Sequence, residues 1–196
     1  MQAYRASILH LLDDPTKTKE AVAFHEDGLL LVDGGRVVAC GDYAKLADEL
    51  GDTPVEDLTG KLIVPGFVDT HIHFPQVDII AAHGEQLLDW LERHTFPAEA
   101  AFADPAHAEE TAEFFVEELL RNGTTSALVF GSVHKGSVEA LFTAAFKRDM
   151  RVIAGKSLMD RNAPPGLTDT VETSRRDMLD LIAEWHGKGR LGYAVT

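Results

Sequence analysis

Two histidines separated by one residue are the strongest chemical signal in this chain. His71 and His73 end residues 64–73, a short apolar and β-branched segment with the sequence VPGFVDTHIH. In a β-strand the side chains alternate between faces, so both imidazoles would project the same way and Ile72 the other. Two such imidazoles can bind one metal ion, and zinc takes His nitrogens at about 2.0–2.1 Å. The segment therefore predicts a metal site, and the competing interpretation is a strand end whose histidines face water.

Asp69 would share this face and is a candidate to orient one of the ligands or to close a hydrogen bond. Most of the other histidines fall on predicted helices or loops, where a solvated imidazole is the ordinary interpretation. His134 follows a predicted strand and is a weaker candidate to line the mouth of the site. Lys156 lies near the end of another predicted strand, and we expect a structural role for it, paired with a carboxylate such as Asp160.

A different zinc motif, His-x-Glu, occurs at His107 and Glu109. In nucleobase deaminases of the cytidine-deaminase fold this motif needs a Pro-Cys-x-x-Cys element for the remaining ligands. The chain has a single cysteine, Cys40, so that ligand set cannot be completed. We expect His107 and Glu109 to lie in the first turn of a helix, where an acidic residue favours the positive end of the helix dipole.

Composition limits the classes of partner. Of the 196 residues, 45% are hydrophobic and 26% are charged, which is typical of a globular protein. The net charge of −14 disfavours nucleic acid and anionic membrane surfaces, and is compatible with a small neutral substrate. One cysteine permits no intrachain disulfide and favours a reducing compartment. With no signal-peptide pattern at the N-terminus, we expect a cytoplasmic protein.

The order of predicted elements indicates two domains. Residues 1–64 predict a small β domain, with strands at 3–12, 28–32 and 36–40, a glycine hairpin turn at 33–35 and a short helix at 43–50. This domain has too few strands to bury two faces, so we expect a β-sandwich-like unit that needs a C-terminal partner segment.

Residues 65–196 alternate strands with helices, which predicts an α/β fold with a parallel sheet. The predicted strands are 62–73, 124–130, 151–158 and 191–195, and the predicted helices are 86–94, 105–121, 137–149 and one within 167–187. Catalytic groups in (β/α)₈ barrels lie at the carboxyl ends of strands, where His71 and His73 stand, so we predict the first half of a TIM-type barrel with about four βα units.

Several stretches carry a family resemblance. Residues 65–73 (PGFVDTHIH) resemble the first barrel strand of the amidohydrolase superfamily of metal-dependent hydrolases. Residues 74–76 (FPQ), 88–99 (LDWLERHTFPAE) and 122–127 (NGTTSA) resemble the guanine deaminase family within it, and residues 155–160 (GKSLMD) match it more weakly. The resemblance implies a zinc-dependent aminohydrolase, with iron as the alternative metal, that converts guanine to xanthine and ammonia in purine metabolism as a homodimer.

By this resemblance His71 and His73 hold the metal and Gln76 contacts the substrate, because a carboxamide suits the amide edge of a purine. Trp90 and Leu91 would form part of the pocket wall. The alternative for Gln76 is an ordinary polar loop residue.

Periodicity offers a different interpretation of Leu91. Together with Leu87 and Leu88 it could simply form the buried face of a helix.

The catalytic residues cannot be named from these 196 residues. The superfamily pattern implies a third ligand His at strand five, a Glu nearby, a further His at strand six and an Asp at strand eight. It also implies an arginine and a phenylalanine after strand four, and all of these positions would follow Thr196. We therefore expect the N-terminal part of a longer enzyme, inactive by itself.

Two alternatives remain open. One is a deaminase or chlorohydrolase of the same superfamily that acts on another heterocycle. The other is a non-catalytic half-barrel that assembles with a second chain or acts as a scaffold.

Overall fold

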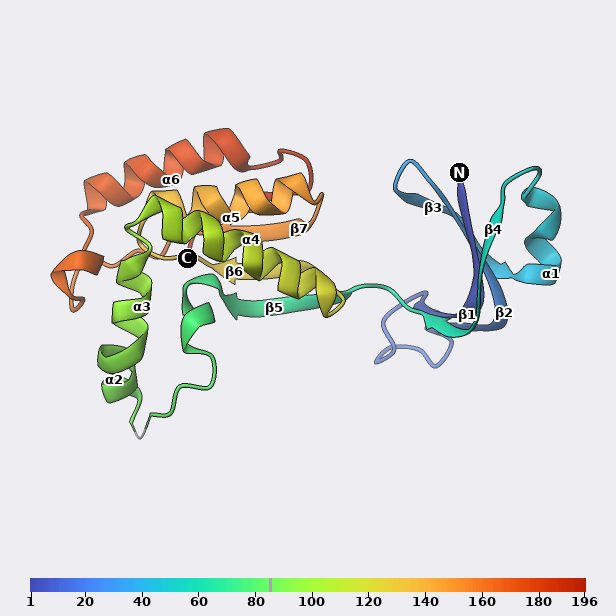
Figure 1. Cartoon of the computed structure of the whole chain (residues 1–196), viewed down its shortest axis with the longest axis horizontal. Helices are drawn as coiled ribbons and strands as arrows, with labels where there is room; N and C mark the ends of the chain where they lie inside the picture. Colours follow the sequence, from blue (N-terminus) through green and yellow to red (C-terminus); the bar gives the residue numbers. More distant parts are fainter. Residues whose placement is uncertain (85) are drawn as a thin grey trace. The chain divides into compact units, whose positions relative to one another are not determined.

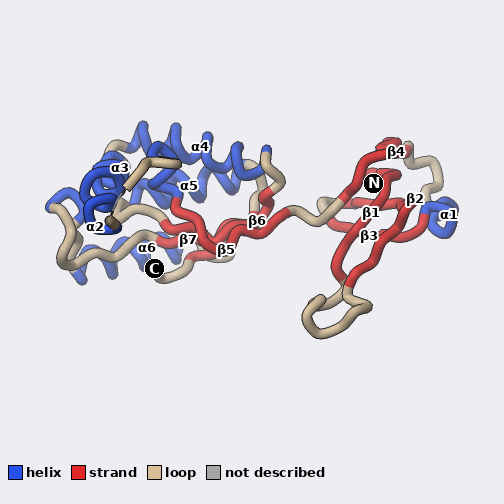
Figure 2. The backbone as a smooth tube through the Cα atoms, turned by 90° about the horizontal axis from the view of Figure 1, so that it is seen from below, coloured by secondary structure: helices blue, strands red, loops and turns tan. Residues whose placement is uncertain are grey.

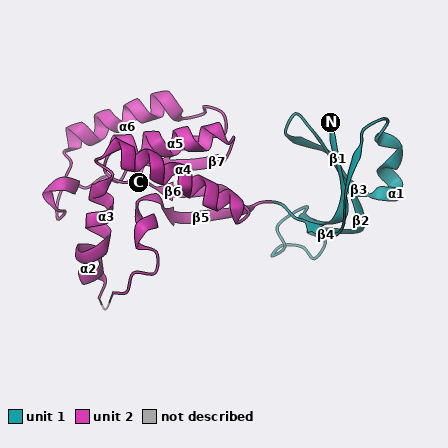
Figure 3. Cartoon of the chain, viewed as in Figure 1, with its two compact units in different colours: residues 1–65 teal, residues 66–196 magenta. Residues whose placement is uncertain are grey.

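The structure is a computed structural model that describes residues 1–84 and 86–196. The chain divides into two compact units, Met1–Pro65 and Gly66–Thr196, drawn in different colours in Figure 3. The first unit is built mainly of strands, and the second alternates strands with helices (Figures 1 and 2).

The first unit is one four-stranded mixed sheet. Its elements in chain order are β1 (Gln2–Leu11), β2 (Val22–Asp33), β3 (Arg36–Asp42), α1 (Tyr43–Leu46), a 3₁₀ turn (Ala47–Glu49) and β4 (Val55–Ile63). The strand order is β3-β2-β1-β4, with β4 parallel to β1 and the other pairs antiparallel. All residues of this unit are described and they form a single sheet, so the second sheet of the expected sandwich-like domain stays a prediction.

The hairpin between β2 and β3 confirms the predicted glycine turn. Gly34 and Gly35 have φ angles of +54° and +75°, the left-handed region that glycine adopts without strain. A two-residue turn with both φ angles positive matches the twist of the flanking strands, and Asp33 accordingly pairs with Arg36.

One face of this sheet carries a small apolar core. Ala3, Leu29 and Leu31 are buried there and pack against Leu46 and Leu50, which follow β3. The short helix α1 and the turn after it are therefore held against the sheet by the packing of Leu46 and Leu50.

The second unit is an α/β structure with a parallel sheet, as predicted. Its elements are β5 (Phe67–His73), a 3₁₀ turn (Phe74–Ile79), α2 (Leu87–Trp90), a π-helical turn (Leu91–Thr95), α3 (Phe96–Ala101), α4 (Pro105–Arg121), β6 (Thr124–Phe130), α5 (Lys135–Lys147), β7 (Arg151–Gly155), a 3₁₀ turn (Pro165–Leu167), α6 (Val171–Trp185) and β8 (Gly192–Tyr193). The strands lie in the order β5-β6-β7-β8, and α5 packs against both α4 and α6. β5 and β8 are the two edges, so the sheet does not close into a barrel within the described residues.

The predicted strand at 62–73 is wrong, because two strands occupy it and they belong to different units. β4 ends at Ile63 and β5 begins at Phe67. Pro65 has no N–H for a strand ladder and restricts the residue before it. Gly66 has no room for a side chain, since a Cβ there would lie 2.1 Å from Oγ1 of Thr125. These two residues separate the strands.

Helix α4 confirms the predicted helix at 105–121. The Asp104 carboxylate accepts a hydrogen bond from the Ala106 N–H at 3.0 Å and caps the N-terminus. Buried residues of the helix, among them Ala108, Ala112 and Val116, join the main core of the unit, which also contains these residues of β6, α5 and β7: Ala127, Val129, Leu141, Phe142, Val152 and Ala154.

Other boundaries differ from the predictions by a few residues. α5 begins at Lys135 rather than at residue 137, and β7 ends at Gly155 rather than at 158. The helical segment predicted at 86–94 extends through α2, the π-helical turn and α3 to Ala101. Among the described residues, no helix is both long and apolar enough to cross a bilayer.

Candidate metal and substrate site

His71 and His73 stand at the carboxyl end of β5 with their Nε2 atoms 3.3 Å apart. Both rings rest against Phe130 of the neighbouring strand β6, with ring centroids 5.2 Å and 4.8 Å from it. Two imidazoles bound to one tetrahedral zinc at 2.0–2.1 Å would place their nitrogens about 3.3 Å apart. The spacing of the two Nε2 atoms therefore fits two ligands of one metal ion.

The environment favours the form of His73 that binds a metal. Burial of the ring lowers the pKa of His73, and the neighbouring His71 lowers it further. A neutral imidazole has a free nitrogen lone pair for a metal ion.

The hydrogen bond that the structure shows for Asp69 is with the main chain of His71 and not with an imidazole. Its carboxylate accepts a hydrogen bond from the backbone N–H of His71 at 2.9 Å. This hydrogen bond lies where the β5–β6 ladder shifts register, between Asp69 and Ile72. Asp69 thus closes a hydrogen bond with the main chain of the candidate ligand His71, and its role in orienting a ligand side chain stays a prediction.

Gln76 lies in the 3₁₀ turn after β5 and contacts one of the two histidines. Its Nε2 atom is 3.3 Å from Nδ1 of His73 and donates to Oε1 of Glu99 at 3.2 Å. Glu99 is a buried residue of α3, and its burial raises the pKa of the carboxyl while the Gln76 hydrogen bond partly offsets this. Glu99, Gln76 and His73 form a continuous chain of polar contacts from a helix to the strand end.

The sequence analysis assigned no role to Glu99. It lies in the 88–99 stretch, followed by the apolar residues Ala100, Ala101 and Phe102. An acidic residue next to this short apolar segment was the one signal that could have indicated a buried carboxylate. Because carboxylates are rarely buried without a partner, it would also have indicated a polar contact for Glu99.

Four of the predicted site residues line one cavity of about 610 Å³: His71, His73, Gln76 and Trp90. The rest of its wall comes from β5 and the segment after it and from α4 and the residue that follows it, namely Ile72, Val77, Ile79, Ile80, Ala81, Phe114, Phe115, Glu118, Leu119 and Asn122. The strand end and the loop after it therefore face a single, largely apolar space.

Trp90 and Leu91 differ in their placement. The indole N–H of Trp90 donates to the carbonyl of Ala82 at 3.1 Å, which ties the loop after β5 to α2. Leu91, which the structure describes, is half-buried and is not one of the residues that line the cavity. Leu87 and Leu88 are 70% and 73% exposed, so the alternative in which they form a buried helix face is wrong for both.

Lys156 has a structural partner, but that partner is Asp169 rather than Asp160. The fully buried ammonium lies 2.5 Å from Oδ2 of Asp169, and the same carboxylate accepts hydrogen bonds from Thr173 and Ser174. Burial alone would raise the pKa of Asp169, but the hydrogen bonds from Lys156 and the two hydroxyls outweigh it and lower that pKa. The carboxylate is therefore held in its charged form.

His134 does not join His71 and His73. It lines a separate cavity of about 430 Å³ together with Asp169 and Thr173. Its burial and the nearby Lys156 lower the pKa of its imidazole.

The parallel sheet, the histidine pair at the end of its first strand and the cavity beside them define a candidate metal-dependent hydrolase. The sequence profile of the amidohydrolase family matches residues 62–195. The chain belongs to the amidohydrolase family.

Guanine deaminases are among the relatives that match this chain. It is 51% identical to the guanine deaminase of Escherichia coli (strain K12) over 100% of this chain and 46% of that protein. The crystal structure of guanine deaminase from Bradyrhizobium japonicum superimposes with a TM-score of 0.95 at 41% identity, over 100% of this chain and 43% of the other. A guanine deaminase from C. acetobutylicum with bound guanine gives a TM-score of 0.89 at 28% identity, over 100% of this chain and 45% of the other. The chain spans about half the length of the curated relatives it matches.

Proposed function

We propose that the protein to which this chain belongs is a zinc-dependent guanine deaminase, which hydrolyses guanine to xanthine and ammonia. One observation carries the proposal: His71, His73 and Gln76 meet in one cavity, in a chain 51% identical along its whole length to a guanine deaminase. The rival superfamily activities on other heterocycles have no comparable support, since the matched atrazine chlorohydrolase is 21% identical and indicates the fold alone.

In this proposal Nε2 of His71 and Nε2 of His73 supply two ligands to the zinc ion. When bound, zinc supplies electrophilic activation of water at neutral pH. Phe130 packs against both rings and restricts their rotation, so the two nitrogens keep their spacing. Iron is the alternative metal, and the metal content of the purified protein distinguishes the two.

Gln76 orients the purine. The nitrogen end of its carboxamide donates to Glu99. The same nitrogen lies beside Nδ1 of His73, but it does not donate to that atom when His73 binds zinc through Nε2, because Nδ1 then carries the proton. The oxygen end is left to accept a hydrogen bond from an N–H of guanine in the cavity. Trp90, which lines the same cavity, provides apolar surface for the base.

The finer architecture follows from the same proposal. We place the four parallel strands in a (β/α)₈ barrel, with β5 as its first strand, in a cytoplasmic homodimeric enzyme of purine catabolism. Support comes from the position of the histidines at the carboxyl end of β5, where barrel enzymes carry their catalytic groups.

The test measures zinc content and guanine hydrolysis in the protein as it is naturally expressed. We expect His71→Ala and His73→Ala each to lose the zinc of this site and to lower kcat/KM for guanine by at least about 100-fold. His83→Ala is the matched control, because His83 is exposed and does not line the cavity. Unchanged guanine hydrolysis in the His71→Ala/His73→Ala double variant, or turnover of another heterocycle in place of guanine, would overturn the proposal.

A further inference from the structure

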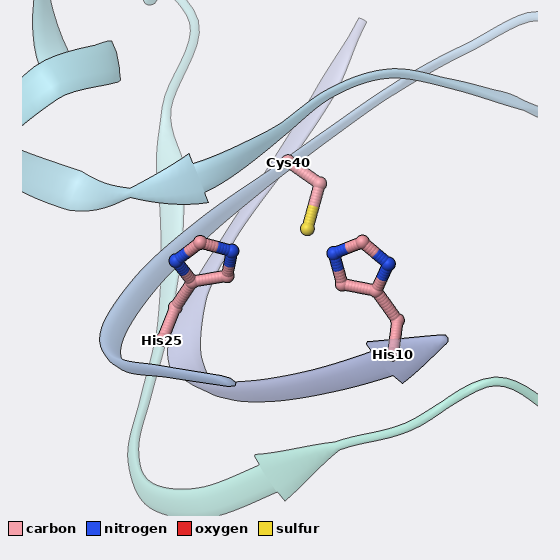
Figure 4. Close-up of side chains that lie close together, drawn as sticks. All are labelled: His10, His25 and Cys40. Carbon is pink, nitrogen blue, oxygen red and sulfur yellow. The ribbon is translucent and has the colours of Figure 1, made fainter. Parts of the chain in front are cut away.

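A second group of side chains of metal-ligating types lies in the first unit, which contains none of the residues of the proposed active site. We propose that His10, His25 and Cys40 bind a transition-metal ion of the zinc type (Figure 4). This inference does not depend on the proposed function, because it rests only on residues of Met1–Pro65.

The three side chains come from three different strands and converge. His10 belongs to β1, His25 to β2 and Cys40 to β3. One ligand atom from each lies within 4.8 Å of the other two, and Figure 4 shows the Cys40 sulfur directed between the two imidazoles. The two rings are nearly parallel, with centroids 6.0 Å apart.

A β-bulge in β2 places His25 on the same face as His10. Ala6 pairs with Gly28 but Ile8 pairs with His25, so β2 contains one extra residue between these two pairs. Without the extra residue His25 would pair with Leu9, and its side chain would point to the opposite face from His10. The irregularity therefore brings two imidazoles together that a regular ladder would separate.

Asp42 holds the ring of His25 in a metal-binding orientation. Nδ1 of His25 lies 2.6 Å from Oδ1 of Asp42, and Lys45 contacts the other carboxylate oxygen at 2.5 Å. A carboxylate on Nδ1 fixes the proton there and leaves Nε2 as the free nitrogen, an arrangement common to histidines that bind metals. His25 thus has both a free donor atom and the partner that orients it.

The donor set identifies the chemical class of the ion. Two imidazoles and a thiolate suit zinc, cobalt(II) or copper, whereas calcium and magnesium prefer oxygen ligands. A tetrahedral zinc site would require nitrogen–sulfur separations of about 3.6 Å, so small side-chain rotations must bring the three atoms closer together. All three side chains are only half-buried, which leaves them room for such rotations.

The consequence of binding would be structural. One ion would join β1, β2 and β3 at a single point, and water could complete its coordination. The alternative is a group of side chains that pack together and bind nothing, with Cys40 as an ordinary half-buried thiol.

The first experiment follows cobalt(II) and zinc binding to the naturally expressed protein after its metals have been removed with a chelator. We expect cobalt to produce thiolate-to-metal charge-transfer absorption that Cys40→Ser abolishes. We also expect zinc to slow alkylation of Cys40 by iodoacetamide at least tenfold, with the modified peptide quantified by mass spectrometry. The second readout needs no variant, so the test remains decisive even where Cys40→Ser fails to fold.

Three variants test whether the metal binds to His10, His25 and Cys40 and not elsewhere in the protein. Asp42→Asn should weaken zinc binding by about 10–100-fold, because it removes the group that orients His25. Lys45→Gln is the matched control, since it removes the other partner of Asp42 and leaves the carboxylate in place. The His71→Ala/His73→Ala double variant should retain the cobalt–thiolate absorption. Absence of that absorption in the wild-type protein, or alkylation of Cys40 at the same rate with and without zinc, would overturn the proposal.

Discussion

The buried carboxyl of Glu99 is costly to place in α3 unless it has a partner, and the partner that the structure shows is the carboxamide of Gln76. That carboxamide in turn contacts His73. If the proposed function is right, Glu99 is therefore expected to act on the site as a positioning residue, through the orientation of Gln76.

We predict that Glu99→Ala raises KM for guanine by about tenfold, which corresponds to about 1.4 kcal/mol, with a smaller change in kcat. Without Glu99 the carboxamide loses one of its two contacts and can rotate away from the substrate. Steady-state kinetics and zinc content should be measured together, since the zinc content is expected to stay unchanged.

The matched control is Gln76→Ala, alone and combined with Glu99→Ala. If Glu99 acts through Gln76, the double variant should be no worse than Gln76→Ala. Additive losses in KM would contradict the positioning role.

At the level of elements, β7 is joined to the segment before α6 by the ion pair of Lys156 and Asp169. Lys156 is fully buried and the Asp169 side chain is 11% exposed, so the pair is largely shielded from water. Removing one partner leaves a buried charge without compensation.

We predict that Asp169→Asn lowers the free energy of unfolding by about 3–5 kcal/mol. Urea denaturation followed by circular dichroism measures this change. Asp180→Asn is the control, because the Lys135–Asp180 pair between α5 and α6 is largely exposed and should contribute at most about 1 kcal/mol. Equal losses of unfolding free energy in the two variants would contradict the prediction that the buried pair contributes more than the exposed one.

Because of the Lys156–Asp169 pair, we also expect the free energy of unfolding to depend on pH. The pKa of Asp169 is lowered in the folded protein, so its contribution to stability is present above the ordinary carboxyl pKa of about 3.9 and is lost as the pH falls below it. The difference in unfolding free energy between wild type and Asp169→Asn should therefore be constant near neutral pH and shrink below about pH 4. A difference in unfolding free energy that grows as the pH falls would contradict this prediction.

The cap at the N-terminus of α4 makes a smaller contribution to the free energy of unfolding. Asp104→Ala removes the cap on the Ala106 N–H and should lower the free energy of unfolding by about 1 kcal/mol. Asp104→Asn keeps a capping oxygen and should retain most of that stability in the same denaturation experiment. A large loss with asparagine would assign the effect to the charge of Asp104 instead.

At the scale of the whole molecule, β5 presents an edge with exposed apolar side chains in the described chain. Phe67 and Val68 are 61% and 66% exposed. Unprotected strand edges readily pair with other strands.

We predict that residues 1–196 expressed alone associate with increasing concentration, and that Val68→Lys reduces this association because a charge on an edge strand opposes pairing. Light scattering across a concentration series measures the change. Val171→Lys is the control, because Val171 is similarly exposed, at 65%, but lies at the start of α6. If both variants act equally, net charge rather than the β5 edge controls association.

The predictions that the structure confirms rest on local signals. The Asp104-Pro105 start of α4 and the two glycines between β2 and β3 each act within a few residues, through capping and backbone conformation. The break at Pro65-Gly66 was visible in the sequence, but the apolar residues on both sides suggested one continuous strand. Only the structure shows that position 66 has no room for a side chain, because Thr125 approaches it closely.

The sequence by itself determined the candidate chemical groups, namely the His71 and His73 pair and the carboxamide of Gln76, together with the strand–helix alternation and the family. Tertiary structure alone decided which groups meet. It paired Lys156 with Asp169, placed Glu99 on Gln76, left Leu91 out of the cavity wall and brought Cys40 to His10 and His25. The physical reason is that strand pairing, bulges and burial set distances between residues far apart in the chain, whereas composition and spacing report only on near neighbours.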